Sequence, residues 1–250
     1  GTLFPYTTLF RSWDLTIMEL NSYSNRGLFT DFYELTMAQG YFDAGKKDQN
    51  ATFELFYRKN PFKGGYTLTC GTYEVMKFIR NYQFSQEDIQ FLRENGEFSE
   101  EFLAYLHDLR FTGEVRGLPE GMVAFRYVPI MQVTAPIIEA QLLETAILNI
   151  YNYSSLVATK ASRIDRATKR KNKILEFGLR RSHGDVGLIG ARAAVIGGCV
   201  GSSNTIAGKL YGLPALGTQA HSWIQSFNSE LEAFRAYAKT FPKNTILLVD

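Results

Sequence analysis

The chain has 250 residues, which is enough for one large domain or two and for a substantial hydrophobic core. Its 27 basic and 25 acidic side chains nearly cancel, so no broad electric field favours nucleic acid or a membrane surface as a partner. No apolar run approaches the roughly 20 residues of a spanning helix, and Cys70 and Cys199 lack metal-binding spacing, so we expect a soluble cytoplasmic protein with reduced thiols.

The beginning of the chain has an unusual pattern. Residues 2–12 look like the conceptual translation of a short-read sequencing adapter, although an apolar N-terminal extension is an alternative interpretation. We therefore predict that residues 1–17 are a non-native extension and that Met18 is the natural start. An N-terminal α+β domain is expected over residues 18–135.

Short helices and strands alternate in this first half. Residues 51–57 have an aromatic-rich strand pattern, and residues 113–117 with 122–125 have the pattern of a β-hairpin. Ser85 and Ser99 stand where N-cap residues of helices are expected. The helix after Ser99 should bury one apolar face, which contains Phe102, Leu103, Leu106 and Leu109.

The second half, residues 136–250, alternates helices with strands. Apolar residues recur at helical spacing from Pro136 to about Ala167. Further elements are expected in this order: strand 173–178, helix 190–196, helix 204–211, strand 214–217, helix 229–240 and strand 245–250. The last helix begins at a capping box, Ser229 to Glu232, and should turn Leu231, Phe234, Ala238 and Phe241 inward. Strands separated by helices predict a parallel α/β domain.

Groups suited to an anionic substrate follow three apolar segments of this domain. Arg180 and Arg181 come after strand 173–178, the run 201–204 leads into a helix, and His221 follows strand 214–217. Ends of parallel strands meet at one rim, where α/β folds keep their sites. Guanidinium forks and helix amides both bind phosphate. Ordinary surface ion pairs, helix caps and a packed or surface histidine remain the alternatives.

Four segments, in order, resemble the signature motifs of nicotinate phosphoribosyltransferases. They are Thr-Asp-Phe-Tyr-Glu-Leu-Thr-Met at 30–37, Glu-Phe-Gly-Leu-Arg-Arg at 176–181, Gly-Ser-Ser-Asn-Thr-Ile-Ala-Gly-Lys at 201–209 and Gly-Thr-Gln-Ala-His-Ser at 217–222. The similarity extends from about residue 28 to residue 250. In the family, strand 245–250 continues into a Thr-Tyr-Asp segment. The resemblance therefore implies a C-terminally truncated chain with an incomplete type II phosphoribosyltransferase α/β barrel at 136–250.

The resemblance also implies a reaction and its participants. Nicotinate and phosphoribosyl pyrophosphate would give nicotinate mononucleotide in NAD salvage, with ATP hydrolysed and Mg²⁺ neutralising the pyrophosphate rather than filling a protein metal site. His221 would be transiently phosphorylated, and Ser222 would meet the nicotinate carboxylate. Substrate phosphates would contact Arg180, Arg181, Gly201, Ser202, Ser203 and Asn204. Asp31 and Tyr33 would complete the site of the neighbouring subunit in a homodimer.

Some alternatives stay open within this resemblance. Ser222 beside His221 favours nicotinate, but nicotinamide phosphoribosyltransferases share the fold, and quinolinate enzymes would need more basic residues. Residues 182–186 are one residue shorter than the family pattern, so the register of Asp185 is open. For the chain by itself, we expect at most ligand binding and no activity.

Overall fold

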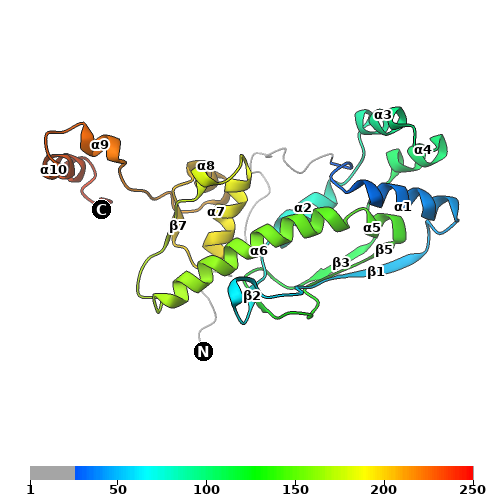
Figure 1. The fold of residues 1–250 in the computed structure, drawn as a ribbon, viewed down its shortest axis with the longest axis horizontal. Coiled ribbons are helices and arrows are strands. Elements are labelled where there is room, and N and C mark those ends of the chain that lie inside the picture. The colour runs from blue at the N-terminus through cyan, green and yellow to red at the C-terminus, as the bar shows by residue number, and fades with distance from the viewer. Residues whose placement is uncertain (1–25, 250) are drawn as a thin grey trace.

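The computed structural model describes residues 26–249, so the extension expected at 1–17 and Met18 lie outside the described residues. The molecule is elongated (Figure 1). An α+β body stands at one end, a long helix leads from it to a group of shorter elements, and a helical pair lies at the other end. Among residues 26–249, no helix is both long and apolar enough to cross a membrane.

The first four helices of the α+β body include two that start at serine caps. They are α1 (Phe32–Asp43), α2 (Thr72–Arg80), α3 (Gln86–Asn95) and α4 (Glu100–Asp108). The Ser85 hydroxyl accepts from the amide of Asp88 at 3.1 Å, and the Asp88 carboxylate accepts from the amide of Ser85 at 2.9 Å, which completes a capping box. Ser99 accepts from the amide of Phe102 at 3.3 Å. Both predicted helix starts are confirmed, and the predicted apolar face of α4 is buried.

Two antiparallel sheets accompany these helices. The larger has the order β1 (Asn50–Leu55), β5 (Met131–Pro136), β3 (Glu114–Gly117), and the smaller pairs β2 (Thr67–Leu68) with β4 (Val123–Ala124). The predicted hairpin of 113–117 with 122–125 is therefore wrong, because its two strands join different sheets. At Gly113 a Cβ would lie 2.4 Å from the Thr134 carbonyl oxygen, so this glycine permits the close approach to β5.

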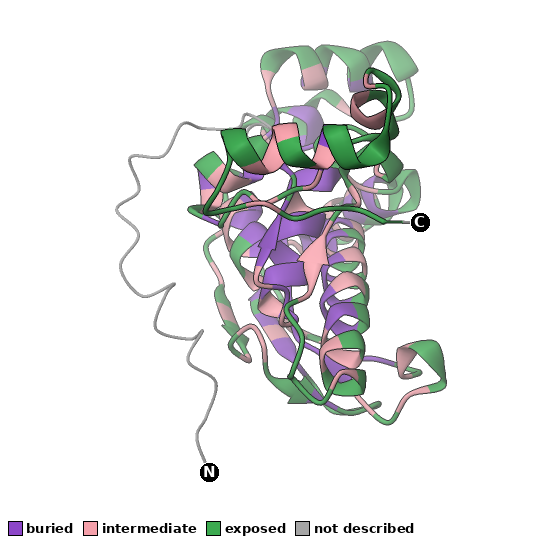
Figure 2. Ribbon diagram, turned by 90° about the vertical axis from the view of Figure 1, so that its left-hand side faces the viewer, coloured by how far each residue is buried: buried purple, intermediate pink, exposed green. Residues whose placement is uncertain are grey.

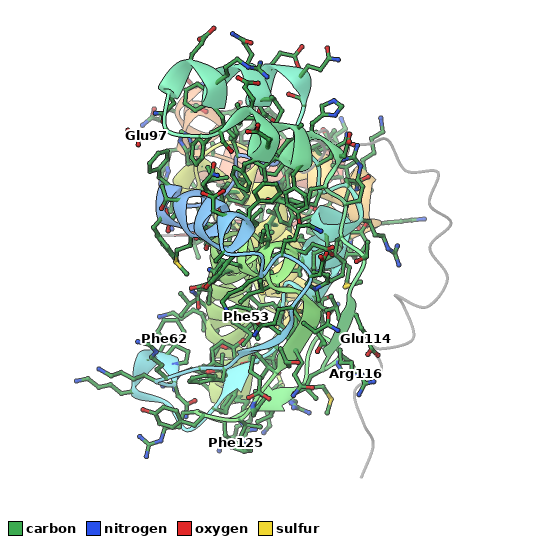
Figure 3. All side chains as sticks on the ribbon, turned by 90° about the vertical axis from the view of Figure 1, so that its right-hand side faces the viewer. Phe53, Phe62, Glu97, Glu114, Arg116 and Phe125 are labelled. Atoms are coloured by element: carbon green, nitrogen blue, oxygen red, sulfur yellow. The ribbon has the colours of Figure 1, made fainter. Side chains whose placement is uncertain are left out.

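The outer face of the larger sheet is open to solvent. Glu114 and Arg116 form an exposed ion pair on β3, with 2.8 Å between Arg116 Nε and Glu114 Oε1 (Figure 3). Phe62 lies near the smaller sheet in the short 3-10 helix η3 (Pro61–Lys63), under the ammonium group of Lys160 at 5.0 Å. Both contacts lie at the protein surface. The opposite face of the larger sheet is buried, and it includes Met131, Val133 and Ala135 of β5.

The helix predicted from Pro136 to Ala167 is divided in two. Helix α5 (Ile137–Gln141) ends at a turn through the fully buried Leu142 and Leu143, and α6 (Glu144–Ala167) then runs on past Ser155. The first half of α6 packs into the main hydrophobic core, which therefore extends from Leu35 to Tyr151. Because both leucines of the turn are part of this core, packing fixes the break.

The remaining elements form a small parallel arrangement. They are β6 (Leu175–Glu176), the 3-10 helix η4 (Leu179–Arg181), α7 (Val186–Ile196), β7 (Gly201–Ser202) and α8 (Thr205–Tyr211). Strands β6 and β7 pair in parallel, and Ser202 forms a parallel bridge to Ala215, so the strand predicted at 214–217 is reduced to one bridge. Helix α7 packs on α6. Parallel pairing with a helical crossover agrees with the predicted α/β character of this half.

The end of the described chain differs from the prediction. Helices α9 (His221–Gln225) and α10 (Glu230–Thr240) pack on each other through Trp223, whose Nε1 donates to the Ala233 carbonyl at 3.1 Å. Ser229 caps α10 as expected, by accepting from the amide of Glu232 at 3.2 Å.

The inward face predicted for α10 is wrong in part. Leu231 is 56% exposed and Phe241 is 50% exposed, whereas Phe234 and Ala238 are half-buried. The physical reason is that α10 finds little besides α9 to pack against in the described chain, and Figure 2 shows it as a mainly exposed helix in front of the body. Residues 245–249 form no strand either, because no neighbouring strand among residues 26–249 pairs with them.

Candidate functional site

The predicted site residues lie in three separate places. Asp31 and Tyr33 are at the start of α1, the arginine pair and residues 201–204 surround β6 and β7, and His221 begins α9. Figure 1 shows α1 and α9 at opposite ends of the elongated molecule, with β7 between them. Within the described residues, one chain therefore brings the arginines close to residues 201–204 but does not bring either group to Tyr33.

At the first place, the Tyr33 hydroxyl is held while its ring stays open. The hydroxyl donates to Glu34 Oε1 and Glu144 Oε1, each at 3.4 Å, and the residue is 47% exposed. Partial burial, followed by the charges of Glu144 and Glu34, raises the pKa of Tyr33. Asp31 accepts from the Thr145 hydroxyl at 3.1 Å. This geometry leaves an aromatic face free to stack on a planar ligand.

Glu34, in the same motif, has a structural position. Its side chain is fully buried and accepts from Thr30 Oγ1, from the amide of Thr145 at 3.1 Å and from Thr145 Oγ1 at 2.8 Å. Burial raises the pKa of this carboxyl. Because Thr145 belongs to α6, these hydrogen bonds fix the start of α1 against α6 and so determine where Tyr33 stands.

At the second place, the arginine pair is presented by a tight turn. The Glu176 carboxylate accepts from the amide of Gly178, and η4 follows directly. A Cβ on Gly187 would lie 2.8 Å from Leu179 Cδ1, so this glycine lets α7 pack closely on η4. Arg180 and Arg181 are both exposed, and in the part of the chain that the structure describes neither guanidinium forms an ion pair. Two cationic side chains are thus available to an anion.

Residues 201–204, beside them, are mostly engaged within the fold. The Ser202 hydroxyl donates to Glu176 at 2.5 Å and accepts from the amide of Asn204 at 3.0 Å. Asn204 caps α8 by accepting from the amide of Ala207 at 3.1 Å. A Cβ on Gly201 would lie 2.6 Å from the Pro214 carbonyl oxygen. Ser203 is the exposed member of the run. Phosphate contact by residues 201–204 stays a prediction, and Ser203 is the residue whose side chain a phosphate can reach.

At the third place, His221 and Ser222 are the exposed first residues of α9. His221 lines a cavity of about 100 Å³ together with Gln219, Ala220, Ile224, Glu230 and Leu248. Gln219 is only 7% exposed, and neither its Nε2 nor its Oε1 has a hydrogen-bond partner in the described chain. The cavity thus combines an imidazole, a carboxylate and a carboxamide. Sequence reasoning missed Gln219, although it lies inside the motif that identified His221.

A buried ion cluster joining the two halves of the chain was also missed. Arg192 of α7 donates to Glu74 of α2 at 3.2 Å and to Glu120 at 2.5 Å. Burial raises the pKa of Glu74, whereas at Glu120 the charge and hydrogen bonds of Arg192 outweigh burial and lower the pKa. The available signal was a single arginine within the apolar run of α7, because a buried arginine requires a partner.

No metal-binding cluster accompanies these groups. Among residues 26–249, no three side chains of His, Cys, Asp or Glu gather in a way that could hold an ion. Cys70 and Cys199 are free and buried, and burial raises the pKa of Cys199 to about 11. Both thiols pack within hydrophobic clusters of the fold.

Comparisons with known proteins identify the family of the chain. The family model described as the nicotinate phosphoribosyltransferase (NAPRTase) N-terminal domain matches residues 28–152. The chain is 45% identical over 224 residues to nicotinate phosphoribosyltransferase pncB2 of Mycobacterium tuberculosis, which covers 89% of this chain and 48% of that protein. It is 43% identical over 224 residues to the nicotinate phosphoribosyltransferase of Bacillus subtilis, with 89% and 45% covered. The chain thus spans about half the length of the curated relatives it matches.

Solved structures agree with these matches. The crystal structure of human nicotinic acid phosphoribosyltransferase superposes with a TM-score of 0.74 at 42% identity, covering 79% of this chain and 40% of that one. The nicotinate-nucleotide pyrophosphorylase of Pyrococcus furiosus shares the fold, with a TM-score of 0.73 at 22% identity over 94% of this chain and 52% of that one. The mixed helix-and-sheet structure is similar to the fold of these enzymes, and the chain belongs to the nicotinate phosphoribosyltransferase family.

Proposed function

We propose that this chain is part of an enzyme that joins nicotinate to 5-phosphoribosyl-1-pyrophosphate. The nicotinate ring nitrogen forms a bond to the ribose C1 while the bond from C1 to the pyrophosphate oxygen breaks, which gives nicotinate mononucleotide and pyrophosphate. The observation that carries this proposal is the family match, with relatives named nicotinate phosphoribosyltransferase over 89% of the chain. The parallel strands β6 and β7 belong, in this proposal, to a type II phosphoribosyltransferase barrel of a longer cytoplasmic protein.

The second group of residues binds the anionic ends of the substrates. Arg180 and Arg181 are exposed cations that follow β6 in the chain, and Ser203 donates its amide to the carbonyl of Glu176 in that strand at 2.9 Å. Paired guanidinium groups suit phosphate oxygens. Mg²⁺ commonly binds through substrate phosphates and water with only one or two protein carboxylates. Mg²⁺ would neutralise the charge of the pyrophosphate group as part of the substrate. The protein's contribution is to position the reactants and to stabilise the leaving group.

His221 couples the reaction to ATP. A neutral imidazole nitrogen attacks the γ-phosphorus of ATP, the new N–P bond forms, and the P–O bond to ADP breaks. Hydrolysis later returns the free imidazole and phosphate. Two observations support this role, namely the exposure of His221 and the Glu230 carboxylate that lines the same cavity. Such a carboxylate can accept the imidazole proton and so keep the ring nucleophilic.

A homodimer completes the site. Tyr33 and His221 lie at opposite ends of one elongated chain, so a head-to-tail pair can place Asp31 and Tyr33 of one subunit beside the arginines of the other. Tyr33 then stacks on the pyridine ring, Asp31 orients the ligands, and Ser222 meets the nicotinate carboxylate. A mixture of Tyr33→Ala and His221→Ala subunits should recover part of the activity, since one shared site stays intact. Verified mixed dimers without any recovery would favour a site within one subunit.

The function itself is tested by product formation. The longer protein that contains this chain is incubated with labelled nicotinate or nicotinamide, phosphoribosyl pyrophosphate and Mg²⁺, with and without ATP, because we expect the chain by itself to be inactive. We expect nicotinate mononucleotide, a phosphate adduct by intact mass, and loss of both the adduct and the ATP effect in His221→Ala. His107→Ala is the matched control, because His107 is an exposed residue paired with Asp108. Turnover of nicotinamide alone, or an adduct that survives His221→Ala, would contradict the proposal.

A further inference from the structure

Gln219 is buried at a place where its side chain finds no partner. It is 7% exposed, and neither the carboxamide nitrogen nor its oxygen is hydrogen-bonded within residues 26–249. Among residues 217–249, it shares the buried class only with Ala233. A polar group left unsatisfied after burial is costly, so native proteins rarely keep one without a reason.

The surroundings of Gln219 indicate which ligand its side chain can bind. It lines the cavity of about 100 Å³ that also contains His221, and the only other ionisable lining residue is Glu230. Ile224, Ala220 and Leu248 supply the apolar remainder of the lining. A cavity of this size can hold water molecules, but it can also hold a small oxyanion attached to the imidazole. The carboxamide nitrogen is the one uncharged N–H donor that the glutamine side chain offers there.

We propose that Gln219 binds the phosphoryl group carried by His221, with its Nε2 donating to a phosphoryl oxygen. This assignment rests on the phosphohistidine of the proposed function. The carboxylate of Glu230 faces the same cavity and opposes free phosphate, so the site is suited to a phosphoryl group that a covalent N–P bond keeps in place. A hydrogen bond to a charged acceptor is stronger than one between neutral groups and would satisfy the buried donor.

Phosphoramidate provides a test that needs neither ATP nor transferase activity. An imidazole nitrogen attacks its phosphorus, an N–P bond forms and ammonia leaves. The full chain is treated with phosphoramidate, and the lifetime of each phosphohistidine is followed by site-resolved mass spectrometry. We expect the His221 adduct to outlive those of His107 and His183. In Gln219→Leu its lifetime should be about tenfold shorter, as the loss of one charged hydrogen bond implies.

Two controls separate binding from simple packing. Gln225→Leu changes an exposed glutamine at the end of α9, the helix that His221 begins, and should leave the His221 adduct unchanged. Thermal unfolding of the unmodified chain should occur at a higher temperature in Gln219→Leu, because the substitution removes an unsatisfied buried group. An equal adduct lifetime in wild type and Gln219→Leu would overturn the proposal, and so would equal lifetimes at all three histidines.

The same data distinguish this proposal from the function on which it rests. If Gln219 prolongs the His221 adduct but the longer protein that contains this chain makes no nicotinate mononucleotide, the proposed function fails and the phosphoryl site stands. If ATP phosphorylates His221 and Gln219→Leu has no effect on the adduct, the function stands and the assignment of Gln219 fails.

Discussion

The two ends of this molecule are built in opposite ways. The main hydrophobic core draws its buried members from residues 35–151, and Phe102, Leu103 and Leu106 are completely buried in it. Residues 217–249 bury only Gln219 and Ala233 and expose large apolar side chains such as Leu231 and Val249. The first region carries the predicted ring-stacking residue Tyr33, and the second carries the predicted phosphoryl acceptor His221.

The large buried core that stabilises the fold and the predicted phosphoryl acceptor therefore lie in different regions of the chain. A region with a large buried core can unfold only as a unit, whereas a region with few buried contacts opens locally at little free-energy cost. The geometry around His221 therefore depends on contacts beyond those of α9 and α10. Three substitutions test the comparison, from the largest expected effect to the smallest.

Phe102→Ala should lower the free energy of unfolding the most. The ring is fully buried between Phe42, Phe98 and Tyr105, so its removal leaves a cavity that costs about 3–5 kcal/mol. Urea unfolding measures the change. Phe91→Ala, which removes a 59% exposed ring from α3, should change the free energy by less than about 0.5 kcal/mol. Equal effects of the two substitutions would mean that the core is placed wrongly.

Glu120→Gln should have an intermediate effect. Of the two carboxyls that bind Arg192, Glu120 is the one with a lowered pKa. The substitution therefore replaces a charged hydrogen-bond acceptor and should lower the free energy of unfolding by about 2 kcal/mol at pH 7. Glu74→Gln should cost about 1 kcal/mol or less, because burial raises the pKa of Glu74 and favours its neutral form.

The pH dependence of unfolding separates these two carboxyls. The contribution of Glu120 is present above its unfolded-state pKa and is lost as pH falls through its lowered folded-state pKa. The contribution of Glu74 has the opposite sign, since it is present at low pH and is lost as pH rises through its raised folded-state pKa. Glu120→Gln should therefore weaken the fall in unfolding free energy as pH is lowered. Glu74→Gln should weaken the fall in unfolding free energy as pH rises through the folded-state pKa of Glu74. The reverse assignment would show that Arg192 pairs mainly with Glu74.

Leu231→Ala should have the smallest effect. Leu231 is 56% exposed on α10, so we expect a change below about 0.5 kcal/mol in the free energy of unfolding. Limited proteolysis should cut within residues 217–249 before it cuts the core, in the wild type and the variant alike. A loss above about 2 kcal/mol would show that a further surface covers α10 in solution.

Local signals in the sequence predicted the helix starts and several strands, but they did not predict which strands pair. Ser85, Ser99 and Ser229 all cap helices, because a cap depends only on the next three residues. The strand at 114–117 was recognised, but its partner β5 stands at 131–136 rather than at 122–125. Strand propensity describes a surface suited to pairing and does not choose the partner.

The candidate site shows the same limit. The motifs located Arg180, Arg181 and His221 on exposed positions, where a ligand can reach them. They did not reveal that the hydroxyl of Ser202 and the amide of Asn204 are used within the fold. The sequence did not identify Gln219, because whether a buried carboxamide finds a hydrogen-bond partner depends on how the chain packs.

The pairing of β1 with β5 has a consequence for how the protein is made. Asn50 lies opposite Pro136, and the core closes only with Ile147, Ile150 and Tyr151 of α6. During synthesis, β1 therefore leaves the ribosome before its partner strand β5 exists. Such long-range closure is slow and leaves apolar surface uncovered in the meantime. The main core is therefore complete only after residue 151 has been made.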